Sequence, residues 1–343
     1  MKQADYTFCI APMMDWTDRH CRVFHRLLSR HARLYTEMIT ANAVIHGDRE
    51  HLIGFSDLEH PVVLQVGGGE PGPLAQAAKI AQSMGYDEVN LNVGCPSDRV
   101  KDGRFGACLM AEPERVAACV KAMQAEVDIP ITVKCRIGID EQDSERDFQR
   151  FVDQVANAGC RVFIVHARKA WLNGLSPKQN RDVPPLDYDR VYRLKETHRD
   201  LTIVINGGIE TLDACENHLA KLDGVMLGRA AYHRPYMLAD VDRRLFGGEQ
   251  NAPLRSQVLG QLMDYTAAHV ASGGRLNNIT RHVLGLMHGR PRARAFRRLL
   301  SGTSGASEPG LEKLQCAIDL ARLLETETTD QETSDTSPAE AAE

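Results

Sequence analysis

No apolar stretch in the 343 residues reaches the length of about 18 residues that a membrane-spanning helix needs, so no membrane anchor is expected. The N-terminal region shows no cleavage-like segment, which argues against a targeting peptide. Nine cysteines occur without a CxxC pair, which argues against a disulfide framework or a zinc site. We therefore expect a cytoplasmic protein that works in a reducing compartment and holds no metal.

Charges of one sign are missing from two long segments. Residues 325–343 contain seven acids and no base, and removing these seven negative charges from the net charge of −5 leaves +2 on the rest of the chain. This acidic end lacks apolar periodicity, so we expect a disordered tail that either solubilises the protein or competes for a basic surface. Between Thr266 and Ser307 there is no acid, and the arginines of that segment are Arg275, Arg281, Arg290, Arg292, Arg294, Arg297 and Arg298. Such an excess of arginine is typical of a surface that binds a polyanion.

Short apolar runs rich in β-branched residues alternate with amphipathic stretches through the first two thirds of the chain. Eight runs are expected to be strands, at residues 7–12, 34–39, 61–66, 88–93, 131–137, 161–166, 202–206 and 224–228. The connection after the second run has no clear pattern. Eight such repeats predict an α/β fold, a (β/α)8 TIM barrel with its active site at the C-terminal ends of the strands. An open doubly wound sheet is the rival, but no GxGxxG follows the first run.

After about residue 250 the strand pattern stops. Helical periodicity continues near residues 254–271, 279–285, 292–300 and 310–325. The expected domains are therefore a catalytic barrel at 1–248, a small all-helical domain at 249–324 and the acidic tail at 325–343.

Polar residues stand where the later strands are expected to end. They are Gln65, Asn90, Asn92, Cys95, Lys134, Arg136, His166, Arg168, Asn206, Gly207, Gly208, Gly228 and Arg229. Glycines and an arginine after strands seven and eight are typical of a phosphate site in such barrels. A lysine inside a barrel needs an anion or a polar ring edge as its partner. Together these residue types suit flavin mononucleotide, FMN.

The loop after the fourth strand presents Cys95 within a long glycine-bearing segment, residues 92–110. Such a loop at a barrel mouth is interpreted as a mobile lid that carries an acid or a nucleophile.

Five segments occur in order and at the spacing of barrel strands: 11–18 (APMMDWTD), 91–96 (LNVGCP), 132–138 (TVKCRIG), 165–168 (VHAR) and 205–209 (INGGI). With them the sequence resembles the tRNA-dihydrouridine synthases over about residues 5–325. It is most similar to the bacterial A subfamily, through 97–100 (SDRV), 103–110 (GRFGACLM) and 168–178 (RKAWLNGLSPK).

This resemblance implies an enzyme that reduces uridine to dihydrouridine at positions 20 and 20a of the tRNA D-loop, with NADPH as electron donor. Hydride would pass from the N5 atom of reduced FMN to C6, and Cys95 would give a proton to C5. The implied FMN-binding residues are Pro12, Met13, Met14, Gln65, Lys134, His166, Asn206, Gly207, Gly208, Gly228 and Arg229. The implied tRNA contacts are Asn92, Lys178, Arg181, Arg294, Arg297 and Arg298.

A monomer is expected. Two other functions stay open on the residues themselves. One is an FMN-dependent barrel that acts on a small molecule, similar to a dihydroorotate dehydrogenase or to old yellow enzyme, which would leave the arginine-rich segment unexplained. The other is an RNA-binding protein on a barrel that has lost catalysis.

Overall fold

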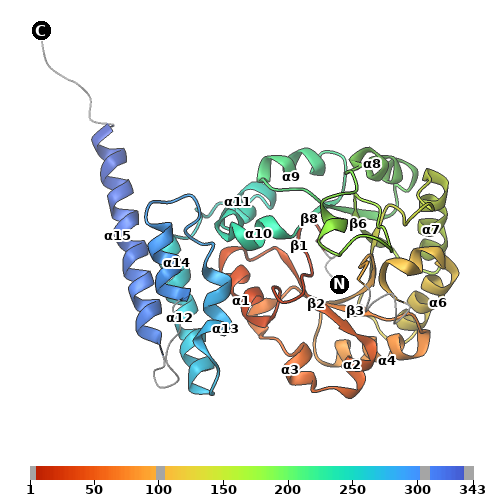
Figure 1. Cartoon of the computed structure of the whole chain (residues 1–343), viewed down its shortest axis with the longest axis horizontal. Coiled ribbons are helices and arrows are strands. Elements are labelled where there is room, and N and C mark those ends of the chain that lie inside the picture. Colours follow the sequence, from red (N-terminus) through yellow and green to blue (C-terminus); the bar gives the residue numbers. More distant parts are fainter. Residues whose placement is uncertain (1–4, 98–104, 302–309, 336–343) are drawn as a thin grey trace, which may run out of the picture.

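The computed structural model describes residues 5–97, 105–301 and 310–335, with side chains described up to residue 327. Within these residues, eight parallel strands close into a barrel in which each strand pairs with the next and the last pairs with the first (Figure 1). The strands are β1 (Phe8–Ile10), β2 (Arg33–Thr40), β3 (Val62–Gly67), β4 (Glu88–Val93), β5 (Ile131–Arg136), β6 (Val162–His166), β7 (Thr202–Asn206) and β8 (Gly224–Leu227). The predicted TIM barrel is confirmed.

Helices follow the strands and cover the outside of the barrel (Figure 1). Local sequence starts several of them: Asp18, Ser144 and Thr211 accept hydrogen bonds from the first turns of α1, α7 and α9, and α4 and α6 begin with proline. The helices around the barrel are α1 (Arg19–Leu28), α2 (Ala41–His46), α3 (Arg49–Ile53), α4 (Pro71–Ser83), α6 (Pro113–Gln124), α7 (Glu145–Asn157), α8 (Tyr188–Thr197), α9 (Leu212–Leu219), α10 (Arg229–His233) and α11 (Val241–Leu245).

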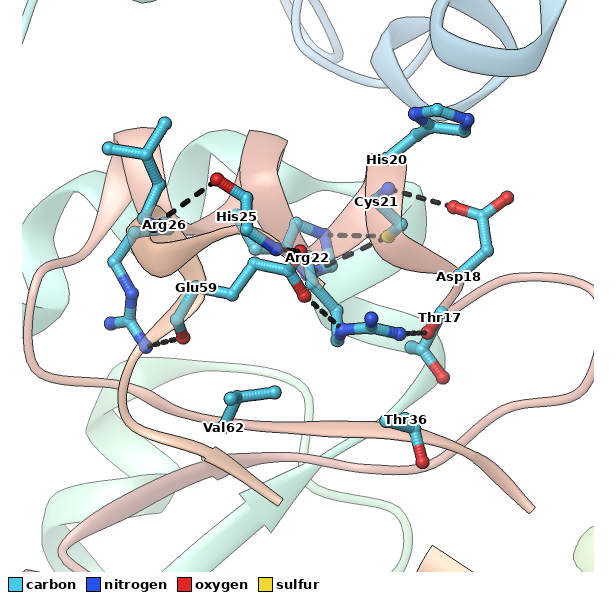
Figure 2. Close-up of polar contacts among 12 residues, drawn as sticks. Thr17, Asp18, His20, Cys21, Arg22, His25, Arg26, Thr36, Glu59 and Val62 are labelled. Atoms are coloured by element: carbon cyan, nitrogen blue, oxygen red, sulfur yellow. Dashed lines mark hydrogen bonds and ion pairs between the residues drawn. The ribbon is translucent and has the colours of Figure 1, made fainter. Parts of the chain in front are cut away.

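The connection between β2 and β3 is held to α1 by a buried ion pair. It contains α2, α3 and a 3-10 turn, η1 (Asp57–Glu59). The Nε of Arg22 donates to Glu59 at 2.5 Å and its Nη1 donates to the Thr17 carbonyl at 2.8 Å (Figure 2). Arg22 and Glu59 are 37 positions apart in the sequence, so the local sequence pattern could not predict how this connection is held.

The barrel interior is apolar on one side and polar on the other. Side chains of alternate residues on β6, β7 and β8 form an inner apolar cluster that includes Ile164, Val204 and Met226. On β4 and β5, the apolar residues Val89, Leu91, Ile131 and Val133 point outward to the helices. Because side chains alternate along a strand, the residues between them face inward: Glu88, Asn90, Asn92, Thr132, Lys134 and Arg136.

Glu88 is a fully buried member of this polar side. Its Oε2 accepts hydrogen bonds from Tyr6 at 2.9 Å and from Arg33 at 3.2 Å, and its Oε1 accepts from Thr132 at 2.6 Å and from Tyr35 at 3.3 Å. Burial raises the pKa of Glu88, and Arg33 and the three hydroxyl donors oppose that shift. Three hydroxyls and a guanidinium therefore converge on one carboxylate with no exposed surface.

The C-terminal helices form a separate layer beside α1 (Figure 1). They are α12 (Arg255–Ala271), α13 (Leu276–Val283), α14 (Ala293–Ser301) and α15 (Leu311–Asp335). At their junction with the barrel, Asp18 caps α1 through the Cys21 amide and also accepts hydrogen bonds from Arg281 and His282. Burial opposes ionisation of Asp18, but the hydrogen bonds from His282, Cys21 and Arg281 hold its pKa well below the usual value.

The last helix extends past the predicted domain end at residue 324. Among the residues of α15 whose side chains are described, Leu324 is the last that is buried, and the backbone stays helical to Asp335. Ser256 donates its hydroxyl to Glu325 at 2.5 Å and Arg292 lies 3.6 Å from Glu327, which favours continuation of the helix. The rest of the predicted tail, residues 336–343, lies outside the described residues. Within the described part of the chain, no helix has the length and apolar character needed to cross a bilayer.

Replacing Glu88 by glutamine is expected to lower the free energy of unfolding by about 3–5 kcal/mol, because Arg33 would stay buried without its anion. Chemical denaturation measures the change. The matched control is Glu114→Gln, because Glu114 pairs with Arg150 at 3.1 Å on the surface, where both side chains are more than half exposed. Equal stabilities for Glu88→Gln and the wild type would contradict a supporting role for the buried pair.

Candidate active site

Parallel pairing brings the predicted strand-end residues to one rim of the barrel. Gln65 of β3 pairs with Asn90 of β4, and Asn92 pairs with Lys134 of β5. On the other side of the rim, Arg136, His166 and Asn206 are in register on β5, β6 and β7. The C-terminal mouth of the barrel is therefore a candidate site built from five adjacent strands.

Asparagine and glutamine side chains form a chain of hydrogen bonds below the mouth. Gln65 donates its Nε2 to Asn90 Oδ1 at 2.8 Å and accepts from Asn92 Nδ2 at 2.8 Å. Asn92 Oδ1 accepts the backbone N–H groups of Gly94 at 3.1 Å and Cys95 at 3.0 Å. These amides fix the start of the loop that carries Cys95.

Cys95 lies at the rim with a partly exposed side chain. Its Sγ is 3.6 Å from the Ser97 hydroxyl, and its carbonyl accepts the Ala107 N–H at 2.9 Å. The thiol is close enough to Lys134 and Arg136 to act on the pKa of both. Residues 98–104 of the predicted lid lie outside the described residues.

Lys134 points its ammonium group into the mouth, where Nζ donates to Asn206 Oδ1 at 3.2 Å. Asn206 in turn donates its Nδ2 to the Met226 carbonyl at 2.7 Å, which fixes the orientation of its amide. Burial, and then the positive charge of Arg136, lower the pKa of Lys134 to about 8. An anion beside Nζ would therefore gain a strong interaction with Lys134.

Arg136 fastens two loops to the rim, a role that the sequence did not reveal. Its Nε donates to the Gly94 carbonyl at 2.9 Å, and its Nη1 donates to the carbonyls of Lys169 at 3.0 Å and Asn180 at 2.9 Å. Asn180 is fully buried and also bonds both backbone groups of Trp171. Arg136 and Asn180 thus hold the insert after β6 against the Cys95 loop.

His166 and the glycines after β7 are packed against each other. Gly207 has φ +114°, and a Cβ there would lie 2.5 Å from the His166 ring. Gly208 has φ +69°, and a Cβ there would lie 2.9 Å from the Tyr188 hydroxyl, which donates to the Gly207 carbonyl at 2.7 Å. Burial, and then the positive charges of Arg136 and Lys134, hold the pKa of His166 well below its usual value. The imidazole is therefore neutral at pH 7.

Arginines gather next to these glycines. Arg229 donates to Asp182 at 2.9 Å, and Arg168 donates to the carbonyls of Pro184 and Asp182. The buried Nε of Arg168 has no hydrogen-bond partner among the described residues. Burial lowers the pKa of Arg168 and of Arg181, and the charge of Arg229 lowers both further. The group is an electropositive site with unused donor capacity.

The loop after β1 closes the ring of strand ends. Met13 donates its N–H to Thr17 at 2.9 Å, and its Sδ lies 3.5 Å from the position that a Cβ on Gly228 would take. Pro12 and Met14 flank it, and Met14 is 56% exposed. The structure thereby brings all the expected cofactor residues to the same mouth.

Comparison with known proteins identifies the family of the chain. The family model described as dihydrouridine synthase (Dus) matches residues 9–322. The chain belongs to the dihydrouridine synthase family. Similar relatives are the tRNA-dihydrouridine(20/20a) synthases of Shewanella oneidensis, 57% identical over 92% of this chain and 94% of the relative, and of Xanthomonas campestris, 58% identical over 88% and 89%. A solved complex of 2-naphthoyl-CoA reductase shares the fold, with a TM-score of 0.53 and 12% identity over 69% of this chain and 50% of that chain.

The expected tRNA residues do not form one cluster. Asn92 lies inside the mouth, Lys178 and Arg181 are exposed on the insert after β6, and the remaining three are exposed on α14 of the helical domain: Arg294, Arg297 and Arg298. Phe296 and Leu300 turn the other face of α14 inward. The structure leaves the arginine face of this helix open to solvent.

Proposed function

We propose that this chain reduces uridine to 5,6-dihydrouridine at positions 20 and 20a of the tRNA D-loop, working as a monomer in the cytoplasm. The names of its relatives support the reaction and the positions. The observation that carries the proposal is the mouth itself: a partly exposed thiol, Cys95, faces a ring of cations and glycines that suits an anionic flavin.

The residues present fit FMN held in the mouth. Gly207 and Gly208 have positive φ angles at the end of β7, and Arg229 follows the adjacent strand β8, so these three suit the phosphate. Lys134 suits the part of the ring where reduced flavin carries negative charge, and Gln65 suits its uracil-like edge. The expected contacts of Pro12, Met13, Met14, His166, Asn206 and Gly228 line the same space. When bound and reduced by NADPH, FMN supplies the hydride that C6 of the uracil receives.

Cys95 acts as the general acid in this proposal. Addition of hydride at C6 leaves C5 with carbanion character, and the thiol gives its proton to that atom. Asn92 holds the Cys95 amide at 3.0 Å, so the thiol is presented by a fixed backbone. The target base has to leave the stack of the D-loop to reach this depth in the barrel.

Binding of tRNA is assigned to Asn92 in the mouth, to the insert through Lys178 and Arg181, and to the helical domain through its arginine face. A cationic surface bonds RNA phosphates and releases counterions, so affinity falls as salt rises. The exposed arginines of α14 supply this charge without a carboxylate on the same helix.

Cys95→Ala is expected to keep its flavin and the reduction of that flavin by NADPH, but to lose dihydrouridine formation by about 10² to 10⁴-fold, because only the second half-reaction needs the proton. Rapid mixing of prereduced enzyme with unmodified tRNA measures that step. Cys108→Ala, on the same loop, is the control and should react normally. Wild-type reoxidation and product formation by Cys95→Ala would refute the assignment.

The affinity for FMN is expected to fall as the pH rises through about 8, because the free site holds Lys134 at that pKa and binding requires the charged ammonium. The slope should approach about tenfold per pH unit. Fluorescence titration of apoprotein with FMN between pH 7 and 9 measures it. Lys134→Met should bind weakly with no such slope, whereas Arg229→Ala should bind weakly and keep it. An identical slope in wild type and Lys134→Met would place the titrating group elsewhere.

Reversal of charge at Arg294 and Arg297 is expected to weaken tRNA binding and to flatten its salt dependence by about one unit of slope for each lost phosphate contact. NADPH oxidation by oxygen should be unchanged. The matched control reverses Arg146 and Arg150 on α7, which are exposed on the far side of the barrel (Figure 1). If both double variants bind tRNA alike, α14 is not the RNA surface.

A further inference from the structure

We propose that buried Glu88 is a positioning residue for Cys95, because its carboxylate fixes the direction of a hydrogen-bond chain that ends on the Cys95 loop. The relay is the set Glu88, Thr132, Asn90, Gln65 and Asn92. Its effect on catalysis rests on the proposed role of Cys95, whereas the relay itself rests on the contacts described next.

The relay has no gap between the floor of the barrel and the mouth. Thr132 Oγ1 donates to Glu88 Oε1 at 2.6 Å and accepts from Asn90 Nδ2 at 2.8 Å. Asn90 Oδ1 accepts from Gln65 at 2.8 Å, and Gln65 Oε1 accepts from Asn92 at 2.8 Å. All five side chains are buried, with at most 8% of their surface exposed. Water therefore competes little for any of these bonds.

The direction of the relay follows from the first group. A carboxylate can only accept, so the single hydrogen of the Thr132 hydroxyl is committed to Glu88 and the hydroxyl oxygen must accept from Asn90. That bond turns Asn90 Oδ1 toward Gln65, which in turn points its own oxygen at Asn92. Each amide thus has one orientation instead of two.

The last amide faces two donors. With Nδ2 bonded to Gln65, the Oδ1 of Asn92 faces the N–H groups of Gly94 and Cys95, and it accepts both. A flipped Asn92 would set its own NH₂ group against those two N–H groups, and the loop would lose its anchor. The orientation set at Glu88 therefore determines whether Asn92 can accept the backbone N–H of Cys95.

A purely structural role would not need this polar column. Other parts of the same interior are filled by Ile164, Val204 and Met226, so apolar side chains can fill this barrel. A buried ion pair is often no more stabilising than well-packed apolar residues of the same volume. The relay is explained by its effect on the orientation of the Cys95 loop.

The test cuts the relay without removing the buried pair. Thr132→Val in the holoenzyme removes the link between Glu88 and Asn90 but retains Arg33 beside Glu88. Hydrogen–deuterium exchange at the Gly94 and Cys95 amides is expected to become at least about fivefold faster, and Thr132→Ser should restore it. The amides of β7 in the same sample report any global loss of stability. Thr266→Val is the matched control, because Thr266 is equally buried but bonds the Leu262 carbonyl in α12.

The second readout is the half-reaction with tRNA. Thr132→Val should slow reoxidation of prereduced enzyme at saturating tRNA, and Thr132→Ser, which keeps the hydroxyl, should restore the rate. Glu88→Gln, whose amide can donate as well as accept, should also speed exchange at Gly94 and Cys95. Unchanged exchange in both variants, relative to β7, would overturn the relay. Faster exchange with normal reoxidation would support the relay and count against Cys95 as the proton donor.

Discussion

A carboxylate buried in the floor of the barrel determines which hydrogen-bonding groups the residues above it must supply. Glu88 can only accept hydrogen bonds, so the strands around it have to supply donors, and they do so from Tyr6, Arg33, Tyr35 and Thr132. Those donors come from β2, β5 and the segment before β1, and they meet at one point only if the barrel is closed. The requirement that each donor meets an acceptor continues through the amide side chains of β3 and β4 to the mouth. Stability and the geometry of the site therefore rest on one polar column.

The sequence was informative wherever a rule of periodicity applied. Apolar runs separated by amphipathic stretches predicted the closed barrel, and the ends of those runs predicted which residues share the mouth, because parallel strands end on the same rim. On β5 the pattern of alternate residues put Thr132, Lys134 and Arg136 on one face and Ile131, Val133 and Cys135 on the other. Lys134 and Arg136 of this face were selected from the sequence as strand-end residues, whereas Thr132 was not.

The sequence could not predict contacts between residues that lie far apart along the chain. Asn180 lies in an irregular insert, and only the fold shows that it is buried and bonded to Arg136, 44 residues earlier. Tyr188 begins α8 as an ordinary amphipathic residue, yet its hydroxyl supports the Gly207 turn. The sequence pattern also did not predict that the backbone of α15 stays helical to Asp335.

Floor and mouth of the barrel differ in how their charges are satisfied. At the floor, the carboxylate of Glu88 accepts four hydrogen bonds from protein donors, so the protein itself completes the site. At the mouth, burial and mutual repulsion lower the pKa of Lys134 to about 8 and that of Arg136 to about 10, and protein carbonyls and amides offset only part of this cost. A ligand with negative charge would supply the remaining compensation, so affinity for an anion is built into the mouth before any ligand arrives. The floor of the barrel thus contributes to stability, whereas the mouth supplies the capacity to bind an anion.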